Sequence, residues 1–176
     1  MPYHFAMKIM GIAGFSGSGK TTLIEKMIPV FVGEGVRVSL VKHAHHEFDI
    51  DQPGKDSYRH RHAGCGEVLI SSSKRWALMH ELRGAAEPSL QEQLKHLSAC
   101  DLVIVEGYKS EPIPKIEVHR RLGNAPLLYP EDGHVVAVAT DEPLDTALPQ
   151  FDLDDAEGVA RFMLQHLGLD RARLVR

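Results

Sequence analysis

A glycine-rich segment near the N-terminus has the residue types and the spacing that bind phosphate. Residues 14–21 read Gly-Phe-Ser-Gly-Ser-Gly-Lys-Thr and match the pattern G-x-x-x-x-G-K-[ST] at every fixed position. Gly14, Gly17 and Gly19 let the backbone curve around an anion and point its N–H groups inward. A helix that begins near Gly19 would add the positive end of its dipole. The segment therefore predicts a site for nucleotide phosphates.

The side chains at the end of this motif supply a charge and a metal ligand. Lys20 would place its ammonium group where the β- and γ-phosphates lie, and the Thr21 hydroxyl would bind Mg²⁺. Ser18 and Thr22 complete the predicted phosphate contacts. The preceding residues, 7–13, form a short apolar run typical of a buried strand. Strand, loop and helix thus follow one another in the order that the motif requires.

An apolar strand that ends in an acid usually supplies the second half of such a site. Residues 101–107 read Asp-Leu-Val-Ile-Val-Glu-Gly, so Glu106 is predicted to lie beside the phosphate loop. It would hold Mg²⁺ through water or orient the attacking water. The candidate catalytic residues are Lys20, Glu106 and Asp49, and the candidate Mg²⁺ ligands are Thr21, Asp49 and Glu106.

The segment from 42 to 57 is long, polar and rich in groups that bind metal or phosphate. It follows a predicted strand and so emerges at the carboxyl edge of the sheet, where ligands bind in open α/β folds. Asp49 or Asp51 could reach the metal, and Lys42 and Lys55 could neutralise phosphate charge. The segment could therefore become ordered on nucleotide binding and act as a switch.

Histidines give this segment two further interpretations. The chain has 11 histidines, and His43, His45 and His46 form a run whose imidazoles could bind Zn²⁺ or Ni²⁺. Their spacing matches no standard zinc pattern, and both cysteines lie elsewhere. A solvated loop whose histidines have no role is the third interpretation, and all three stay open.

Asp141 is the candidate for reading the base. Thr140 and Asp141 follow an apolar strand predicted at 134–139. A carboxylate there could accept hydrogen bonds from the N1 and N2 donors of guanine, a pair that adenine does not offer, so Asp141 would favour GTP. An ordinary turn after the strand is the alternative.

The composition is that of a soluble globular domain. Of 176 residues, 43% are hydrophobic and 25% are charged, and the formal net charge of −4 gives no support to nucleic-acid binding. No apolar run approaches the ~20 residues of a membrane span. We see no signal peptide and no disulfide framework. The sequence predicts one cytoplasmic domain over residues 1–176.

Strand and helix patterns alternate along the chain, which predicts an α/β fold. Its expected form is the three-layer sandwich of P-loop NTPases, a mostly parallel sheet with an antiparallel hairpin added. Asp56 and Ser57 are expected to cap a short helix, and Asp154 with Glu157 resembles a capping box. The expected strands span 7–13, 36–41, 67–72, 75–80, 101–107, 115–119 and 134–139, and the later helices span 88–97 and 156–167.

Several segments together resemble one family, the MobB family of molybdopterin-guanine dinucleotide biosynthesis adapter proteins. The phosphate loop alone is generic, whereas the histidine run followed by Pro-Gly-Lys-Asp-Ser at 53–57 is more particular. The resemblance covers nearly the whole chain. The segments that carry it are 14–22, 42–46, 49–51, 53–57, 75–78, 105–109 and 136–141.

The resemblance implies a GTP-binding protein with slow GTPase activity, and a homodimer in which the hairpin extends the sheet between subunits. Its implied partners are the MobA guanylyltransferase and other proteins that handle the molybdenum cofactor. The candidate nucleotide contacts within the 42–57 segment are Lys42, His43 and Lys55. Ser16 stands where the related dimeric ATPases have a signature lysine, so an intersubunit lysine mechanism is not expected.

Two other functions stay open beside this GTP- and Mg²⁺-binding adapter. A small-molecule kinase that uses ATP would have a similar phosphate loop, with Asp51 as its base and Arg59 on a lid. A metallochaperone would bind metal through the histidine run. Neither nucleic acid nor a membrane is expected as a partner.

Overall fold

The computed structural model describes residues 7–44, 48–121 and 125–170 and divides the chain into two compact units. The first unit comprises Met1–His43 and His96–Arg176, and the second comprises Ala44–Lys95. The single domain expected over residues 1–176 stays a prediction. None of the helices in the described ranges is both long and apolar enough to cross a membrane.

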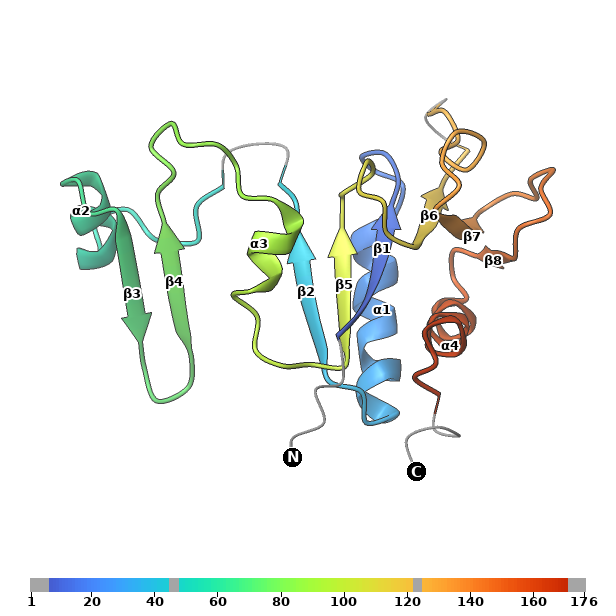
Figure 1. Cartoon of the computed structure of the whole chain (residues 1–176), viewed down its shortest axis with the longest axis horizontal. Helices are drawn as coiled ribbons and strands as arrows, with labels where there is room; N and C mark the ends of the chain where they lie inside the picture. The colour runs from blue at the N-terminus through green and yellow to red at the C-terminus, as the bar shows by residue number, and fades with distance from the viewer. Residues whose placement is uncertain (1–6, 45–47, 122–124, 171–176) are drawn as a thin grey trace. The chain divides into compact units, whose positions relative to one another are not determined.

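The first unit is built on a parallel sheet. Its six strands lie in the order β2-β5-β1-β6-β7-β8 (Figure 1), and every neighbouring pair is parallel. All carboxyl ends therefore lie at one edge, with β1 between β5 and β6. The strands are β1 (Lys8–Ala13), β2 (Val38–Lys42), β5 (Leu102–Glu106), β6 (Lys115–His119), β7 (Val135–Thr140) and β8 (Gln150–Asp152).

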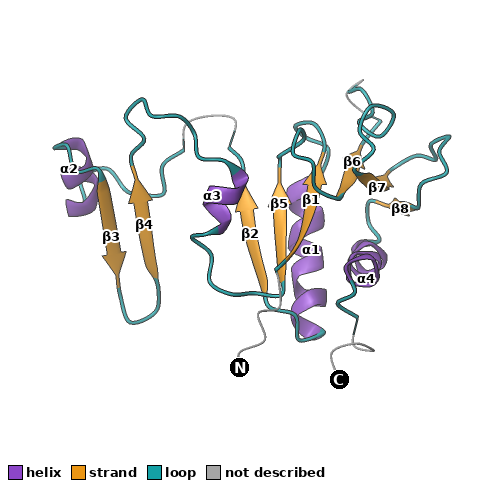
Figure 2. Cartoon of the chain, viewed as in Figure 1, coloured by secondary structure: helices purple, strands orange, loops and turns teal. Residues whose placement is uncertain are grey.

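The second unit contains the expected antiparallel hairpin, formed by β3 (Glu67–Ser71) and β4 (Trp76–His80) (Figure 2). The unit also has two short helices, α2 (Asp56–His62) and α3 (Leu90–Leu94). The predicted fold class is thus confirmed as a mostly parallel α/β sheet of P-loop-like type with a small antiparallel pair.

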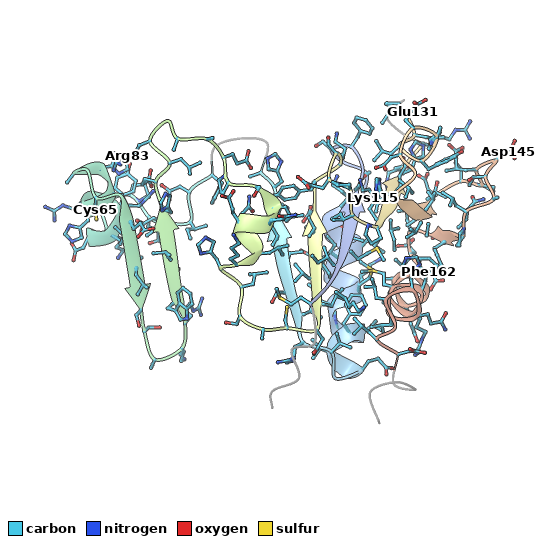
Figure 3. The ribbon with its side chains drawn as sticks, in the orientation of Figure 1. Cys65, Arg83, Lys115, Glu131, Asp145 and Phe162 are labelled. Atoms are coloured by element: carbon cyan, nitrogen blue, oxygen red, sulfur yellow. The ribbon has the colours of Figure 1, made fainter. Side chains whose placement is uncertain are left out.

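Strand β6 carries a fully buried lysine, Lys115 (Figure 3). Its Nζ donates hydrogen bonds to the carbonyl oxygens of Lys109 at 2.7 Å and Glu111 at 2.8 Å, and to the Asp132 carboxylate at 2.6 Å. A buried ammonium group is tolerated only when its protons have such partners. Lys115 therefore fastens the segment that follows β5 to the turn that precedes β7.

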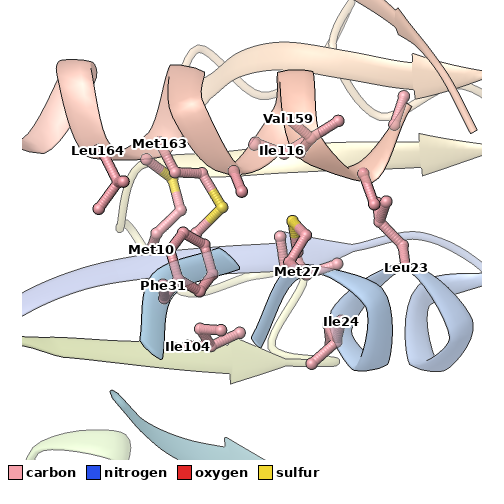
Figure 4. Close-up of a cluster of buried hydrophobic side chains, with 14 of the residues drawn as sticks. Met10, Leu23, Ile24, Met27, Phe31, Ile104, Ile116, Val159, Met163 and Leu164 are labelled. Atoms are coloured by element: carbon pink, nitrogen blue, oxygen red, sulfur yellow. The ribbon is translucent and has the colours of Figure 1, made fainter. Parts of the chain in front are cut away.

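Two helices cover the core of the first unit, α1 (Lys20–Gly33) and α4 (Ala156–Leu167). They contact each other, and Phe31 of α1, Met163 of α4 and Met10 of β1 are fully buried in one cluster (Figure 4). Leu23, in the first turn of α1, belongs to the same cluster, so the packing also holds the start of α1, where the phosphate loop joins it.

The caps or the bounds of three helices differ from the prediction. The helix expected at 88–97 spans only Leu90–Leu94, and Ser89 caps it through a capping box with Glu92. Lys55, not Asp56 or Ser57, is the N-cap of α2, because the Ser57 hydroxyl donates to Asp51 instead.

The capping assignment at α4 was also wrong by one residue. Asp155, not Asp154, is the N-cap, and its carboxylate accepts a hydrogen bond from the Gly158 N–H at 2.9 Å. Asp154 forms an ion pair with Lys26 of α1 instead. The three-residue strand β8 was not expected at all, since so short a stretch carries no readable alternation of apolar and polar residues.

Candidate functional site

The predicted phosphate loop lies between the carboxyl end of β1 and the start of α1. Gly19 is the N-cap of α1, with a φ of 102°, and no side chain caps this helix. The first-turn N–H groups thus have the arrangement that binds anions at helix N-termini. This stretch holds the predicted phosphate contacts Gly14, Gly17, Ser18, Gly19, Lys20, Thr21 and Thr22.

Gly14 lets the loop approach β6 closely. Its φ is 149°, and a Cβ at this position would overlap the carbonyl oxygen of Val118. Only glycine avoids that overlap. The first glycine of the motif therefore serves the packing of loop against strand as well as the curvature of the loop.

The loop's own backbone holds the Lys20 ammonium group. Nζ donates to the Phe15 carbonyl oxygen at 2.7 Å and lies 3.5 Å from Ser18 Oγ. Burial lowers the pKa of Lys20 below its ordinary value; the Glu106 carboxylate opposes this shift, while two neighbouring lysines add to it. Contacts within the loop thus fix the position of this cation.

Glu106 lies beside the loop, in the position that the sequence predicts. It is buried at the end of β5, and its Oε1 accepts a hydrogen bond from the Thr21 hydroxyl at 3.0 Å. Lys42, at the end of β2, places its Nζ 3.2 Å from the same oxygen. A hydroxyl and a carboxylate oxygen are hard donors of the kind that Mg²⁺ prefers. Their catalytic and metal-binding roles stay predictions.

His43 continues from Lys42 along the same edge. Its backbone N–H donates to the Glu106 carbonyl oxygen at 2.9 Å, and its ring lies 5.2 Å from that of Tyr108. Lys109 places Nζ 4.1 Å from the centre of the Phe15 ring, a cation–π contact with the phosphate loop. The segment after Glu106 is therefore held against both the loop and the end of β2.

Asp49 and Asp51 belong to the second unit, where both pair with Arg61. Arg61 lies 2.7 Å from Asp49, 3.3 Å from Asp51 and 2.6 Å from Glu81, and its side chain is 10% exposed. Hydrogen bonds from Arg61 hold the pKa of Asp49 below its ordinary value. Metal binding by Asp49 stays a prediction and would have to compete with this ion pair.

The remaining candidates of the 42–57 segment are Lys55, His45 and His46. Lys55 is exposed at the start of α2, and its phosphate contact stays a prediction. His45 and His46 lie outside the described residues. Within the described ranges, no group of three or more His, Cys, Asp and Glu side chains is arranged to hold a metal ion.

Asp141 directly follows β7, at the same carboxyl edge as Glu106. Its Oδ1 accepts a hydrogen bond from the Arg121 backbone N–H at 2.9 Å, which fixes the carboxylate next to the end of β6. A cavity of about 390 Å³ adjoins it, lined by Thr140, Asp141, Glu142, Pro143, Gln150, Phe151 and Asp152. The reading of guanine by Asp141 stays a prediction.

A second cavity, of about 320 Å³, adjoins the phosphate loop on its β6 side and was not predicted. Phe15, Ser16 and Ser18 of the loop line it, together with residues 117–120 and Ala125. Glu117, which is 1% exposed, accepts hydrogen bonds from the N–H groups of residues 128 and 129. The sequence feature that could have indicated this side of the cavity is the carboxyl end of the strand predicted at 115–119, because ligands bind at the carboxyl ends of strands in parallel sheets.

Comparison with known proteins agrees with this architecture. Residues 9–141 match the family model described as MobB, molybdopterin guanine dinucleotide synthesis protein B. The chain is 42% identical over 160 residues to the molybdopterin-guanine dinucleotide biosynthesis adapter protein of Escherichia coli, covering 89% of this chain and 91% of that protein. The Haemophilus influenzae protein of the same name is 43% identical over 156 residues, covering 88% and 86%.

Solved structures of MobB proteins are similar to this chain in fold. A crystal structure of molybdopterin-guanine biosynthesis protein B is similar with a TM-score of 0.69 at 30% identity, covering 90% of this chain and 99% of that one. A MobB homologue from Bacillus stearothermophilus has a TM-score of 0.68 at 26% identity, covering 92% and 99%. Family model, sequence relatives and fold agree, and the chain belongs to the MobB family.

Proposed function

We propose that this chain binds GTP with Mg²⁺, hydrolyses it slowly, and serves as an adapter in the biosynthesis of molybdopterin guanine dinucleotide. The observation that carries the nucleotide part is the contact of Thr21 with Glu106 at 3.0 Å beside the held ammonium group of Lys20. The adapter role is supported by the names of the relatives from Escherichia coli and Haemophilus influenzae, which are 42% and 43% identical to this chain.

The residues present fit a magnesium nucleotide. The start of α1 and Lys20 would bind the phosphates, and Thr21 with Glu106 would hold Mg²⁺, directly or through water. Bound Mg²⁺ would supply positive charge to the phosphate oxygens. Lys42 balances the charge of the Glu106 carboxylate, since the two lie 3.2 Å apart. Asp141 has further acceptor capacity beyond its bond to the Arg121 N–H, enough for two guanine donors.

Calorimetric titration with GTP and with ATP, each with and without Mg²⁺, tests this proposal. We expect tighter binding of GTP, strengthened by Mg²⁺, and a preference for GTP that falls in Asp141→Asn, because an amide offers one acceptor where the carboxylate offers two. A preference for ATP would overturn the GTP assignment. An undiminished preference in the variant would remove Asp141 from base recognition.

The kinase alternative has weaker support. Asp51, its candidate base, accepts the Ser57 hydroxyl at 2.8 Å and pairs with Arg61. Arg59, its candidate lid arginine, lies 3.8 Å from Asp56 on the exposed side of α2. Both groups thus have structural partners within the second unit. Phosphorylated product formed from ATP and a small acceptor would be the result that revives this alternative.

We also propose that the chain forms a homodimer through the β3–β4 hairpin, and that its partners are a MobA-type guanylyltransferase and other molybdenum cofactor proteins, in the cytoplasm. The hairpin leaves large apolar side chains exposed: Leu69, Ile70, Trp76 and Leu78. Exposed apolar groups gathered on one element often mark a protein interface.

Trp76→Lys is expected to convert the dimer largely to monomer in sedimentation, because it places a charge in the proposed interface. Val32→Lys is the matched control, since Val32 is 60% exposed and Trp76 is 63% exposed, but Val32 lies on α1. A monomeric wild type would overturn the dimer. A dimer that survives Trp76→Lys would exclude the hairpin as the interface.

A further inference from the structure

Arg120 extends the phosphate site on the side opposite Glu106. It follows β6, which neighbours β1 on one side while β5, with Glu106 at its end, neighbours β1 on the other. A Cβ placed on Gly19 would lie 3.4 Å from Nη2 of Arg120. The guanidinium group therefore lies next to the glycine whose backbone begins α1.

The contacts of the Arg120 guanidinium group leave its donors available among the described residues. Within the described ranges, no hydrogen bond or ion pair joins it to another residue, and the side chain belongs to an exposed residue. A hydrogen bond from Lys26, at 2.9 Å, is the main cause that lowers the pKa of Asp154. The charge of Arg120 has the smallest effect on that pKa. Arg120 thus keeps its hydrogen-bond donors for a ligand.

Its surroundings make room for a ligand. Arg120 lines the cavity of about 320 Å³ beside the loop, together with Phe15, Ser16 and Ser18. Glu117 of β6 also lines the cavity and accepts the backbone N–H groups of Leu128 and Tyr129, three and four residues after Ala125. These bonds hold the chain near Ala125 to the strand that lines the cavity.

We infer that Arg120 binds the α- and β-phosphates of the nucleotide from the β6 side of the loop. On the opposite side, Thr21 and Glu106 are the proposed ligands of Mg²⁺, which would bind there together with the γ-phosphate. A guanidinium group on the β6 side contacts the phosphates that GTP and GDP share. Its planar fork suits phosphate oxygens better than an ammonium group does. This inference rests on the proposed nucleotide binding.

The test compares Kd values for GTP and GDP, measured by titration calorimetry, in wild type and in Arg120→Ala. Both Kd values are expected to rise by a similar factor, about tenfold or more, as for the loss of a hydrogen bond to a charged group. Arg120→Lys should lose less, because it keeps the charge without the fork. The thermal midpoint should stay unchanged, since the side chain is exposed.

Arg121→Ala is the matched control. Arg121 is the next residue, its exposed guanidinium group lies 3.4 Å from Glu142, and its contact with Asp141 comes from the backbone. We expect nucleotide affinity within about twofold of wild type. Unchanged affinity in Arg120→Ala, or a loss confined to GTP, would overturn the inference and leave the proposed function standing. A wild type that binds neither nucleotide would overturn both.

Discussion

Replacing Lys20 with alanine is expected to weaken GTP binding by about a hundredfold or more while the fold stays intact. The ammonium group donates to the Phe15 carbonyl oxygen and is thereby held within the loop. In the complex it would meet phosphate oxygens, and charge-assisted hydrogen bonds of this kind are the strong ones. Lys20 is only partly buried, so its loss leaves no large cavity.

Lys26→Ala is the control for this experiment, because Lys26 lies on the same helix and pairs with Asp154 on an exposed surface. Titration calorimetry should find its GTP affinity equal to that of wild type. Circular dichroism and thermal midpoints should show that both variants are folded. If Lys20→Ala kept the wild-type affinity, the phosphate loop could not be the binding site.

Replacing Lys115 with methionine is expected to lower the free energy of unfolding by about 3 kcal/mol or more. Methionine has nearly the same length but donates no hydrogen bond. Two backbone carbonyl groups and the Asp132 carboxylate would lose the partner they now share. Since Lys115 is fully buried, water cannot replace that partner without opening the structure.

Urea denaturation at pH 7 measures this loss, with Lys8→Met as the control. Lys8 is exposed at the start of β1, so its replacement should change the free energy of unfolding by no more than about 0.5 kcal/mol. Equal urea midpoints for the two variants would show that the buried ammonium group contributes nothing to stability.

The ion pair between Lys115 and Asp132 predicts that the free energy of unfolding falls at acid pH. Burial alone would raise the pKa of Asp132, but hydrogen bonds from Lys115 and His134 lower it from 3.8 to about 2. The unfolded state therefore binds a proton more readily, so this stabilisation is present above about pH 4 and is lost as the pH falls towards 2. In Lys115→Met this fall should be smaller, because the carboxyl loses its strongest partner. An identical pH profile in both proteins would contradict this assignment.

The position of Glu106 beside the phosphate loop could be predicted from the sequence. The motif fixed the loop, and the apolar run at 101–107 had to be a buried strand whose carboxyl end meets the loop's edge of a parallel sheet. The strand at 115–119 and the helix at 156–167 were predicted with the bounds observed. The bounds of these elements could be predicted because their hydrophobic periodicity and their local turn signals agree.

Lys115 and Arg120 show what sequence could not predict. A lysine in a strand normally faces water, and only the tertiary packing of three acceptors around Lys115 makes its burial possible. Arg120 is a candidate phosphate contact only because it lies near Gly19, about one hundred residues earlier in the chain. Asp154 and Asp155 are equally suitable caps by type, and the Lys26 ion pair decides between them.

The chain passes between the two units twice, and the two junctions lie at different ends of the strands. The segment 44–95 leaves the sheet after His43, at the edge that carries the phosphate loop, and the chain re-enters the sheet at the opposite edge, where β5 begins. Among the described residues, the first junction contacts the site through the bond from the His43 N–H to the Glu106 carbonyl oxygen. A protein that bound residues 44–95 and displaced His43 would therefore change nucleotide affinity. By thermodynamic linkage, the nucleotide would change the affinity for that protein by the same factor.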